Sequence, residues 1–412
     1  MTVLSGMRVI EHAAFVAVPL AGMTLAQMGA TVIRVDRLGG GLDAGRWPLA
    51  PSGQSLFWAG MNKGKKSVAV DTRHPEGQAL VQHLVAAPGD DAGLFLTNLP
   101  ARGWLDHETL RILRDDVVSV TLMGDRHGRP QVDYTVNPAL GMPHMTGPEG
   151  FREPVAHALP AWDLIAGNMC VSALLAAERH RLRTGQGQNV QLALKDVAAA
   201  TMGHLGMLGD ATLNTTDRTK AGNALYGAYG QDFVCADGRR IMVIGLTDRQ
   251  WRGLIKATRT EDAMRAMERR YGISLADEGE RWRRRTEITD ILRPWFAARR
   301  VSEFRTEFDA VGLTWSEFRT VREALADDAD LSSDNPMFDV LHQPGLGTYP
   351  TPRHPATFGA VDRTAAQVAP SLGAHTEEVL GDVARLTDTE IAHLFDTGIV
   401  QSDTYSATRS AA

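Results

Sequence analysis

Asp163 is the residue of this chain best placed to do chemistry, because it stands at the start of a long apolar stretch. It follows Pro160-Ala161-Trp162, and the stretch continues to about Arg183 with a helical pattern. A carboxylate at the start of a helix can cap it by accepting hydrogen bonds from the first N–H groups. It can also act as a nucleophile toward an activated acyl group, with nearby N–H groups stabilising the oxyanion. The spacing alone leaves both roles open.

A second candidate site is a lysine-rich segment that precedes a predicted strand. Its sequence is Asn62-Lys63-Gly64-Lys65-Lys66-Ser67. Lysines beside a glycine-containing turn either form a solvated basic surface or contact the phosphates of a bulky anionic ligand. Arg37 follows another predicted strand, and the loop Thr97–Gly103 follows a third. Ligands of open α/β sheets bind at the carboxyl ends of the strands. Arg37 and this loop therefore lie along one candidate ligand-binding edge.

The scaffold for these residues is an alternation of strand and helix patterns. Helical segments separate the predicted strands, and Pro19 and Gly29 suit the first turn and the end of the first helix. This alternation indicates βαβ units and a parallel sheet. The predicted strands of the first third are Val9–Glu11, Thr31–Asp36, Ser67–Val70, Gly93–Leu96 and Val117–Leu122.

Changes in composition along the chain divide it into domains. We predict a large domain over residues 1–208, a polar linker over 209–224, a smaller α+β domain over 225–325, and a segment over 326–412 that returns to the large domain. The smaller domain should contain a hairpin in which Phe233–Cys235 and Arg240–Ile244 flank a turn at Asp237-Gly238.

Composition and missing motifs disfavour several classes of protein. The 412 residues include 43 Lys+Arg and 49 Asp+Glu, a net charge of -6 that does not suit a nucleic-acid-binding protein. No apolar run is long enough for a membrane helix, and two cysteines are too few for a disulfide framework or a thiolate metal site. The loop 12–18 contains no glycine, which disfavours a dinucleotide site. We expect a cytoplasmic enzyme with no metal, nucleic-acid or membrane partner.

Taken in order, these segments resemble the class III CoA-transferase family, which also contains racemases of methyl-branched acyl-CoAs. The resemblance implies an α/β fold with a Rossmann-like large domain, a smaller α+β domain, and an interlocked homodimer. It also implies that CoA thioesters are the substrates, with no further cofactor. The matching segments are Arg8–Pro19, Leu25–Asp36, Asn62–Ser67, Thr97–Pro100, Asp163 with its helix, Thr184–Gln188 and Ala369–Thr376.

The resemblance also implies which positions bind CoA. Family members often carry a basic residue a few places after the loop at Asn98, where this chain has Leu105-Asp106, and Arg102 could substitute. The other matching positions are Phe15, Val16, Ala17, Arg37, Lys63, Lys65, Lys66, Asn98 and Leu99.

In the family the residue that matches Asp163 is a covalent nucleophile, so the resemblance favours that role over a helix cap. Attack on an acyl-CoA would give a mixed anhydride and CoA thiolate, and the thiolate would then form an aspartyl-CoA thioester. Further matches, among them Gly39–Pro48 and Leu159–Asp163, resemble members that move CoA between the two carboxyls of one C5 dicarboxylate. The expected substrate is mesaconyl-CoA, converted from the C1 to the C4 thioester.

A dicarboxylate turning in a closed pocket needs a cation or N–H donors for its free carboxylate. His12 and Arg46 are candidates on family grounds only, and a structural or surface role is the favoured alternative for each. The segment Tyr226-Gly227-Ala228-Tyr229-Gly230 matches a flap that family members place over the aspartate. Its glycines, Gly227 and Gly230, could instead serve a hairpin turn.

Three other functions stay open. One is an intermolecular transferase with a separate carboxylate acceptor, and another is a non-catalytic acyl-CoA-binding homologue, against which the intact Asp163 argues. The third is a racemase, which needs two proton-transfer groups. The His-Asp pair of racemases corresponds to Val132-Asp133 here, and valine carries no proton. His127 and His144 lie nearby and would weaken this argument in another register.

Overall fold

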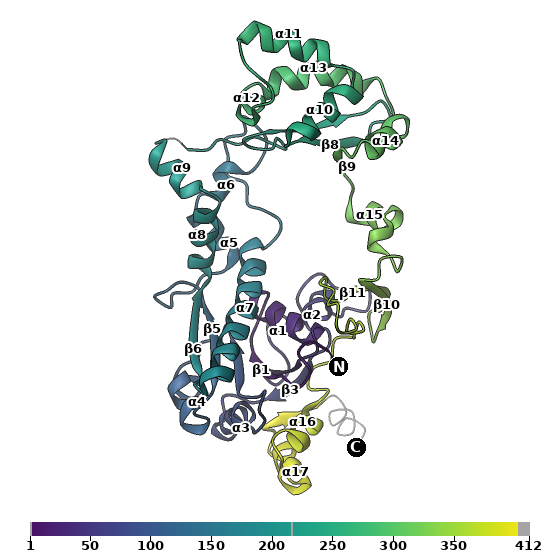
Figure 1. Cartoon of the computed structure of the whole chain (residues 1–412). Helices are drawn as coiled ribbons and strands as arrows, with labels where there is room; N and C mark the ends of the chain where they lie inside the picture. Colours follow the sequence, from purple (N-terminus) through teal and green to yellow (C-terminus); the bar gives the residue numbers. More distant parts are fainter. Residues whose placement is uncertain (1, 216, 403–412) are drawn as a thin grey trace. The chain divides into compact units, whose positions relative to one another are not determined.

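A computed structural model describes residues 2–215 and 217–402, which form two compact units (Figure 1). Unit 1 contains the described residues up to Leu140, Ala158–Asp210, and those from Asp328 onward. Unit 2 contains Gly141–His157 and Ala211–Asp327. Segments from both ends of the chain therefore build unit 1.

A seven-stranded sheet of order β12-β3-β2-β1-β4-β5-β6 runs through unit 1. Every neighbouring pair is parallel except β12 with β3. The strands from β1 to β5 are largely buried and rich in Val, Ile and Leu, as expected for a sheet covered on both faces. The predicted α/β fold is confirmed. The strands are β1 (Arg8–His12), β2 (Thr31–Asp36), β3 (Lys66–Val70), β4 (Leu94–Thr97), β5 (Val118–Met123), β6 (Gln188–Ala193) and β12 (Val400–Gln401).

Helices connect these strands and supply the rest of the core. Leu394 and Phe395, near the end of the described chain, share a hydrophobic cluster with Val68 of β3 and Leu84. The helices of unit 1 are α1 (Ala17–Gln27), α2 (Leu56–Met61), α3 (Pro75–Ala86), α4 (His107–Leu113), α5 (Asp133–Ala139), α7 (Ala161–Thr184), α8 (Leu194–His204), α16 (Thr376–Asp382) and α17 (Asp388–Asp396). Two 3-10 turns, η1 (Gly103–Leu105) and η2 (Ala329–Leu331), and the hairpin β10 (Phe338–Gln343) and β11 (Gly347–Pro352) complete it.

Unit 2 is a three-stranded antiparallel sheet packed against helices. The predicted hairpin is present, because β7 (Tyr229–Val234) pairs with β8 (Arg240–Gly245) across the turn at Asp237-Gly238. Its core includes the rings of Phe296, Phe304 and Phe308. The remaining elements are α6 (Met142–Met145), α10 (Asp248–Ala257), α11 (Glu261–Tyr271), α12 (Glu278–Arg283), α13 (Arg285–Ala297), α14 (Val301–Ala310), β9 (Thr314–Glu317) and α15 (Val321–Asp327).

Two features differ from the predicted domain boundaries. Gly141–His157 belongs to unit 2, where the Gly222 N–H donates to the Gly147 carbonyl (3.1 Å) and Arg285 pairs with Glu149 (2.9 Å). The predicted linker, 209–224, begins inside a helix, α9 (Met207–Leu213), which crosses the boundary between the units. No helix in 2–215 or 217–402 combines the length and apolarity needed to cross a membrane.

Candidate active site

Asp163 is the third residue of α7, and another residue caps that helix. The N-cap residue, Pro160, provides no side-chain hydrogen bond. Instead Asp133, the first residue of α5, accepts from the N–H of Trp162 (2.8 Å) and more weakly from that of Asp163 (3.4 Å) through Oδ2. Asp133 therefore caps α7, which is the role that the sequence left open for Asp163. The Asp163 carboxylate does not cap the helix.

The surroundings of Asp163 make it a more basic carboxylate than usual. Burial, and then the charge of Asp133, raise its pKa to about 6. Asp133 is only 1% exposed, and Asp163 is partly exposed. Within the described chain no hydrogen-bond donor contacts the Asp163 carboxylate. A partly accessible carboxylate that is ionised near pH 7 but more basic than usual is suited to attack an acyl group.

Asp133 caps α7, a role that its position beside Val132 in the sequence does not indicate. The absence of Ser, Thr, Asp or Asn just before α7 was a usable signal that a distant side chain caps the helix. Val132 is 51% exposed and carries no titratable group, so the structure offers no proton donor at the racemase histidine position. His144 lies in unit 2, and His127 contacts Arg126.

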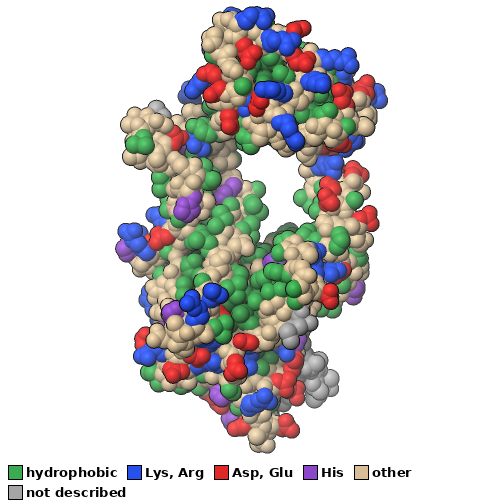
Figure 2. Space-filling model, in the orientation of Figure 1, with side chains coloured by type: hydrophobic (Ala, Val, Ile, Leu, Met, Phe, Trp, Pro, Cys, Tyr) green, Lys and Arg blue, Asp and Glu red, His purple; other side chains and the backbone are tan. Residues whose placement is uncertain are grey.

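Close packing brings the start of α1 to the first turns of α7. A Cβ added to Gly167, one turn after Asp163, would lie 2.6 Å from the carbonyl oxygen of Ala17. Such an approach requires glycine, because any larger residue would separate the two helices. Hydrophobic side chains gather on the face of unit 1 that carries α1 and α7 (Figure 2).

The structure joins two loops that were predicted to bind CoA. The Asn98 side chain accepts from the Ala14 N–H (2.9 Å) and donates to the Ala14 carbonyl (2.8 Å). Phe15, the next residue, has a φ of 66°, a left-handed conformation that is rare for a bulky side chain. Phe15, Val16 and Ala17 thus lie beside Asn98 and Leu99, at the carboxyl ends of β1 and β4.

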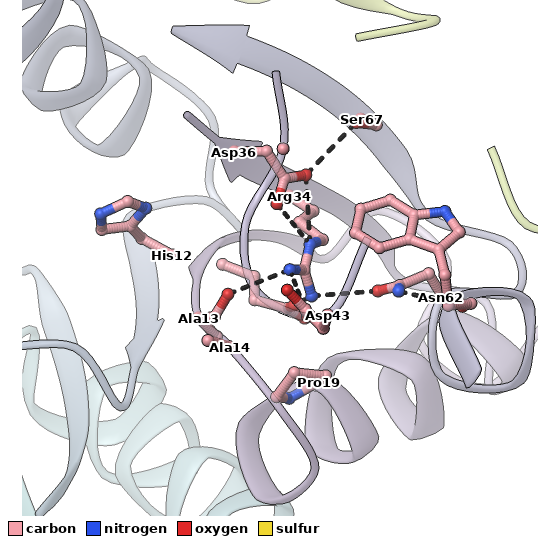
Figure 3. A network of polar contacts seen from close by, with 12 residues as sticks. His12, Ala13, Ala14, Pro19, Arg34, Asp36, Asp43, Asn62 and Ser67 are labelled. Carbon is pink, nitrogen blue, oxygen red and sulfur yellow. Dashed lines mark hydrogen bonds and ion pairs between the residues drawn. The ribbon is translucent and has the colours of Figure 1, made fainter. Parts of the chain in front are cut away.

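Arg34 forms the centre of a buried polar network at this edge of the sheet (Figure 3). Its side chain is fully buried, and its guanidinium contacts oxygens from five different residues. These contacts tie β2 to the loops that follow β1 and β2 and to the end of α2. The acceptors are Glu11 (3.3 Å), Asp36 (2.9 Å), Asp43 (2.7 Å), Asn62 (3.2 Å) and the Ala13 carbonyl (3.1 Å).

The structure corrects the prediction that Lys65 contacts CoA. Its side chain is completely buried, and burial lowers its pKa to about 8. Nζ lies 2.9 Å from Glu11 Oε1, from the Pro19 carbonyl and from Asn62 Oδ1. Three acceptors satisfy all three ammonium hydrogens, so Lys65 has no donor left for a phosphate.

Of the other predicted CoA-binding cations, Arg37, Lys66 and Arg102 are accessible, whereas Lys63 is buried. Lys66 pairs with Glu378 at the surface, and the exposed Arg37 donates through Nε to the Gly40 carbonyl (2.6 Å). Lys63 is 8% exposed and donates to the Gly60 carbonyl, and burial lowers its pKa to about 8. Arg102 is exposed in the loop after β4. Leu105-Asp106, the departure from the family pattern, has a structural role, since Asp106 caps α4.

The predicted pocket residues divide between the two units. His12 lies within 3.0 Å of the Val35 carbonyl through Nδ1, and burial lowers its pKa. Arg46, in unit 1, is exposed and lies against two aromatic rings. In unit 2, Tyr226 packs on Arg218, and Gly227 is exposed in a turn with φ of 81°.

Gly230 lies inside a strand rather than in an open turn. It is a buried residue of β7, where an added Cβ would lie 2.6 Å from Ile244 and 2.7 Å from Leu225. Close packing inside the strand explains this glycine, as the alternative in the sequence analysis allowed.

Comparison with known proteins settles the family. The model of CoA-transferase family III matches residues 4–376. The chain belongs to this family. It is 54% identical to 2-methylfumaryl-CoA isomerase of Chloroflexus aurantiacus over 399 residues, an alignment that covers 97% of this chain and 98% of that protein. The same organism's succinyl-CoA–D-citramalate CoA-transferase is 28% identical, over 95% of this chain and 96% of that one.

A solved structure of a CaiB/BaiF family protein from Brucella suis has the same fold. It is 24% identical, with a TM-score of 0.75 over 92% of this chain and 99% of that chain. Among the described residues of the present chain, no group of three or more His, Cys, Asp or Glu side chains is arranged to hold a metal ion.

Proposed function

We propose that this chain is a 2-methylfumaryl-CoA isomerase, which moves CoA from the C1 to the C4 carboxyl of one mesaconate molecule. The observation that carries the proposal is the 54% identity to such an isomerase, which spans nearly the whole of both chains. The site in unit 1 supports the chemistry, because Asp163 is a partly accessible carboxylate whose pKa is raised to about 6.

The reaction starts with attack of an Asp163 carboxylate oxygen on the thioester carbonyl. The C–S bond breaks, which gives a mixed anhydride and CoA thiolate. The thiolate then attacks the aspartyl carbonyl and forms an aspartyl-CoA thioester, releasing the mesaconate carboxylate inside the pocket. Mesaconate turns, and its other carboxylate attacks the aspartyl thioester. A second anhydride forms and thiolate returns to the C4 carbonyl, which regenerates Asp163. Atoms and charge balance without a redox or metal cofactor.

CoA would lie along the edge of unit 1 at which β1, β2 and β4 end. The loop Phe15–Ala17 and the Asn98-Leu99 pair would contact its pantetheine arm, and the accessible cations Arg37, Lys66 and Arg102 would face its phosphates. This placement of CoA is supported by the two hydrogen bonds between Asn98 and Ala14, which hold both loops at the same edge of the sheet. The family resemblance implies an interlocked dimer, and we propose that two copies of the chain form the enzyme.

Mass spectrometry with labelled mesaconate tests the proposal. The protein is incubated with unlabelled mesaconyl-C1-CoA and an excess of labelled free mesaconate, and the C1 and C4 thioesters are separated by chromatography before their masses are measured. We expect unlabelled C4 thioester with the intact chain. Asp163→Ala and the isosteric Asp163→Asn should lower the rate by at least about a thousandfold, because each removes the nucleophile.

The same experiment tests the second candidate, an intermolecular CoA transferase. The 28% identity to succinyl-CoA–D-citramalate CoA-transferase favours this alternative to a smaller degree. Label in the thioester product would establish it and reject the isomerase. Absence of any conversion by well-folded protein would contradict both activities.

A further inference from the structure

Lys65 is a buried cation whose contacts join three separate elements of unit 1. Its side chain has no exposed surface, and its ammonium group lies 2.8 Å from the nearer carboxylate oxygen of Glu11, on β1. The same group lies 2.9 Å from the Pro19 carbonyl of α1 and 2.9 Å from Oδ1 of Asn62, the residue that ends α2. Lys65 itself immediately precedes β3. One ammonium group therefore connects β1, α1 and the end of α2 to the start of β3.

α1 lies directly against this buried ion pair. A Cβ added to Gly22 of α1 would lie 1.8 Å from Glu11 Oε2 and 3.4 Å from Lys65 Cε. Gly22 and Pro19 are three residues apart and share one side of the helix. Pro19 lies beside the polar network in Figure 3. A residue without a side chain thus lets α1 approach the ion pair closely enough for the Pro19 carbonyl to accept from Lys65.

The opposite side of α1 meets the helix that carries Asp163. An α-helix turns by about 100° per residue, so Ala17 and Leu20 lie on the side of α1 away from the ion pair. A Cβ added to Gly167 of α7 would lie 2.6 Å from the Ala17 carbonyl oxygen and 3.1 Å from Leu20 Cδ2. Gly167 follows Asp163 by one turn, so α1 is packed between the buried ion pair and the first turns of α7.

We infer that Lys65 is a positioning residue, which holds α1 where it fits against α7 beside Asp163. This inference deepens the proposed function and rests on it for the role of Asp163 as the nucleophile. A buried ion pair contributes little net stability compared with apolar residues of similar volume, so its value here is the one arrangement of α1 that it permits. The role differs from a contact with CoA phosphates, which the resemblance implied for Lys65, because it acts on every thioester that reaches Asp163.

Steady-state kinetics with two thioesters test this role. Lys65→Met removes the ammonium group, and the double variant Lys65→Met/Glu11→Gln also avoids leaving a buried carboxylate short of its counter-charge. The substrates are mesaconyl-CoA and mesaconyl-pantetheine, which carries no phosphate. We expect kcat to fall by about ten- to a hundredfold, and by the same factor with both substrates, because a misplacement of about 1 Å costs up to about a hundredfold in rate.

Two kinetic outcomes would overturn the inference. A fall confined to mesaconyl-CoA would assign Lys65 to the phosphates, and an unchanged kcat in the folded double variant would show that α1 needs no ion pair. The matched control is Leu84→Ala, which removes a buried side chain of α3 from the cluster that contains Val68 and Phe395. This control should lower Tm and leave kcat unchanged. An equal loss of kcat in the control would attribute the effect of Lys65 to stability alone and would also contradict the inference.

Hydrogen exchange provides a readout that does not require activity. In the folded double variant the amides of α1 should exchange at least about tenfold faster, while those of α3 keep their rates. Equal exchange of α1 in the variant and the parent chain would overturn the inference. A parent chain that converts neither thioester would count against the proposed function alone, since the exchange of α1 still tests whether Lys65 holds this helix.

Discussion

Asp133 and Asp163 show how one site divides two carboxylates between different tasks. They are 30 residues apart, yet Asp133 accepts hydrogen bonds from the start of the helix that carries Asp163. The buried Asp133 is stabilised by N–H groups of the helix, whereas the partly exposed Asp163 has a raised pKa. The helix cap therefore also tunes the proposed nucleophile, because the negative charge of Asp133 makes ionisation of Asp163 harder.

This coupling predicts the pH dependence of the reaction. Asp163 must be ionised to attack, so kcat/KM should fall on the acid side of a pKa of about 6. In Asp133→Asn the amide oxygen can still accept from the Trp162 N–H, but the neighbouring charge is gone. The acid limb should therefore move to lower pH, by up to about one unit, while burial keeps part of the raised value.

Rates of the two proteins between pH 4.5 and 8 would check this. Thermal melts at each pH are the control, because they separate a shifted titration from unfolding. An acid limb that stays in place in Asp133→Asn would contradict the assigned cause of the shift.

At the scale of elements, the contact between α1 and α7 places the predicted CoA-binding loop beside the helix that carries the proposed nucleophile. α1 is apolar and mostly buried. The distance of closest approach between α1 and α7 is therefore determined mainly by the steric fit of their residues. Gly167 allows the close approach, since an added Cβ would meet backbone that cannot move aside.

Gly167→Ala should destabilise the protein by about 1–3 kcal/mol through overpacking, and it should lower kcat. The matched control is Gly203→Ala in α8, where the nearest atom to an added Cβ is a flexible Leu208 carbon at 3.6 Å. That substitution should be neutral or slightly stabilising, because alanine favours helix. Urea denaturation and initial rates measure both effects, and equal behaviour of the two variants would refute the packing argument.

At the scale of the whole molecule, the proposed homodimer explains apolar surface that the single chain leaves uncovered. α9 buries none of its residues within the chain, and Leu213 is 82% exposed. Exposed apolar residues on a short helix are typical of a surface that another subunit covers.

Light scattering coupled to gel filtration should give twice the mass of the chain. Leu213→Glu should weaken the association, because a charged side chain in an apolar interface loses hydration without gaining a partner. A monomer that retains full activity would contradict the dimer. An unchanged dimer in Leu213→Glu would place the interface elsewhere.

The sequence by itself determined the order of strands and helices along the chain and the parallel sheet, and it left Asp163 open as a helix cap or a nucleophile until the family resemblance favoured the nucleophile. These features depend on local patterns: alternation of apolar strands with helices, and an aspartate at the start of an apolar helix. The resemblance to the family added the CoA-binding loops, and the full-length family match confirmed the family. Each of these can be recognised without knowing which segments meet.

Only the tertiary structure decided what the charged side chains do. Lys65 belongs to a basic turn, but its ammonium group lies inside the protein because Glu11, 54 residues earlier, is buried beside it. Asp133 caps a helix 29 residues away, and Arg34 holds the loop that carries Arg46. Whether a charge faces phosphate, substrate or a buried partner depends on which loops converge at the sheet edge. Spacing along the chain does not contain that information, because it arises only when the strands pair and the helices pack.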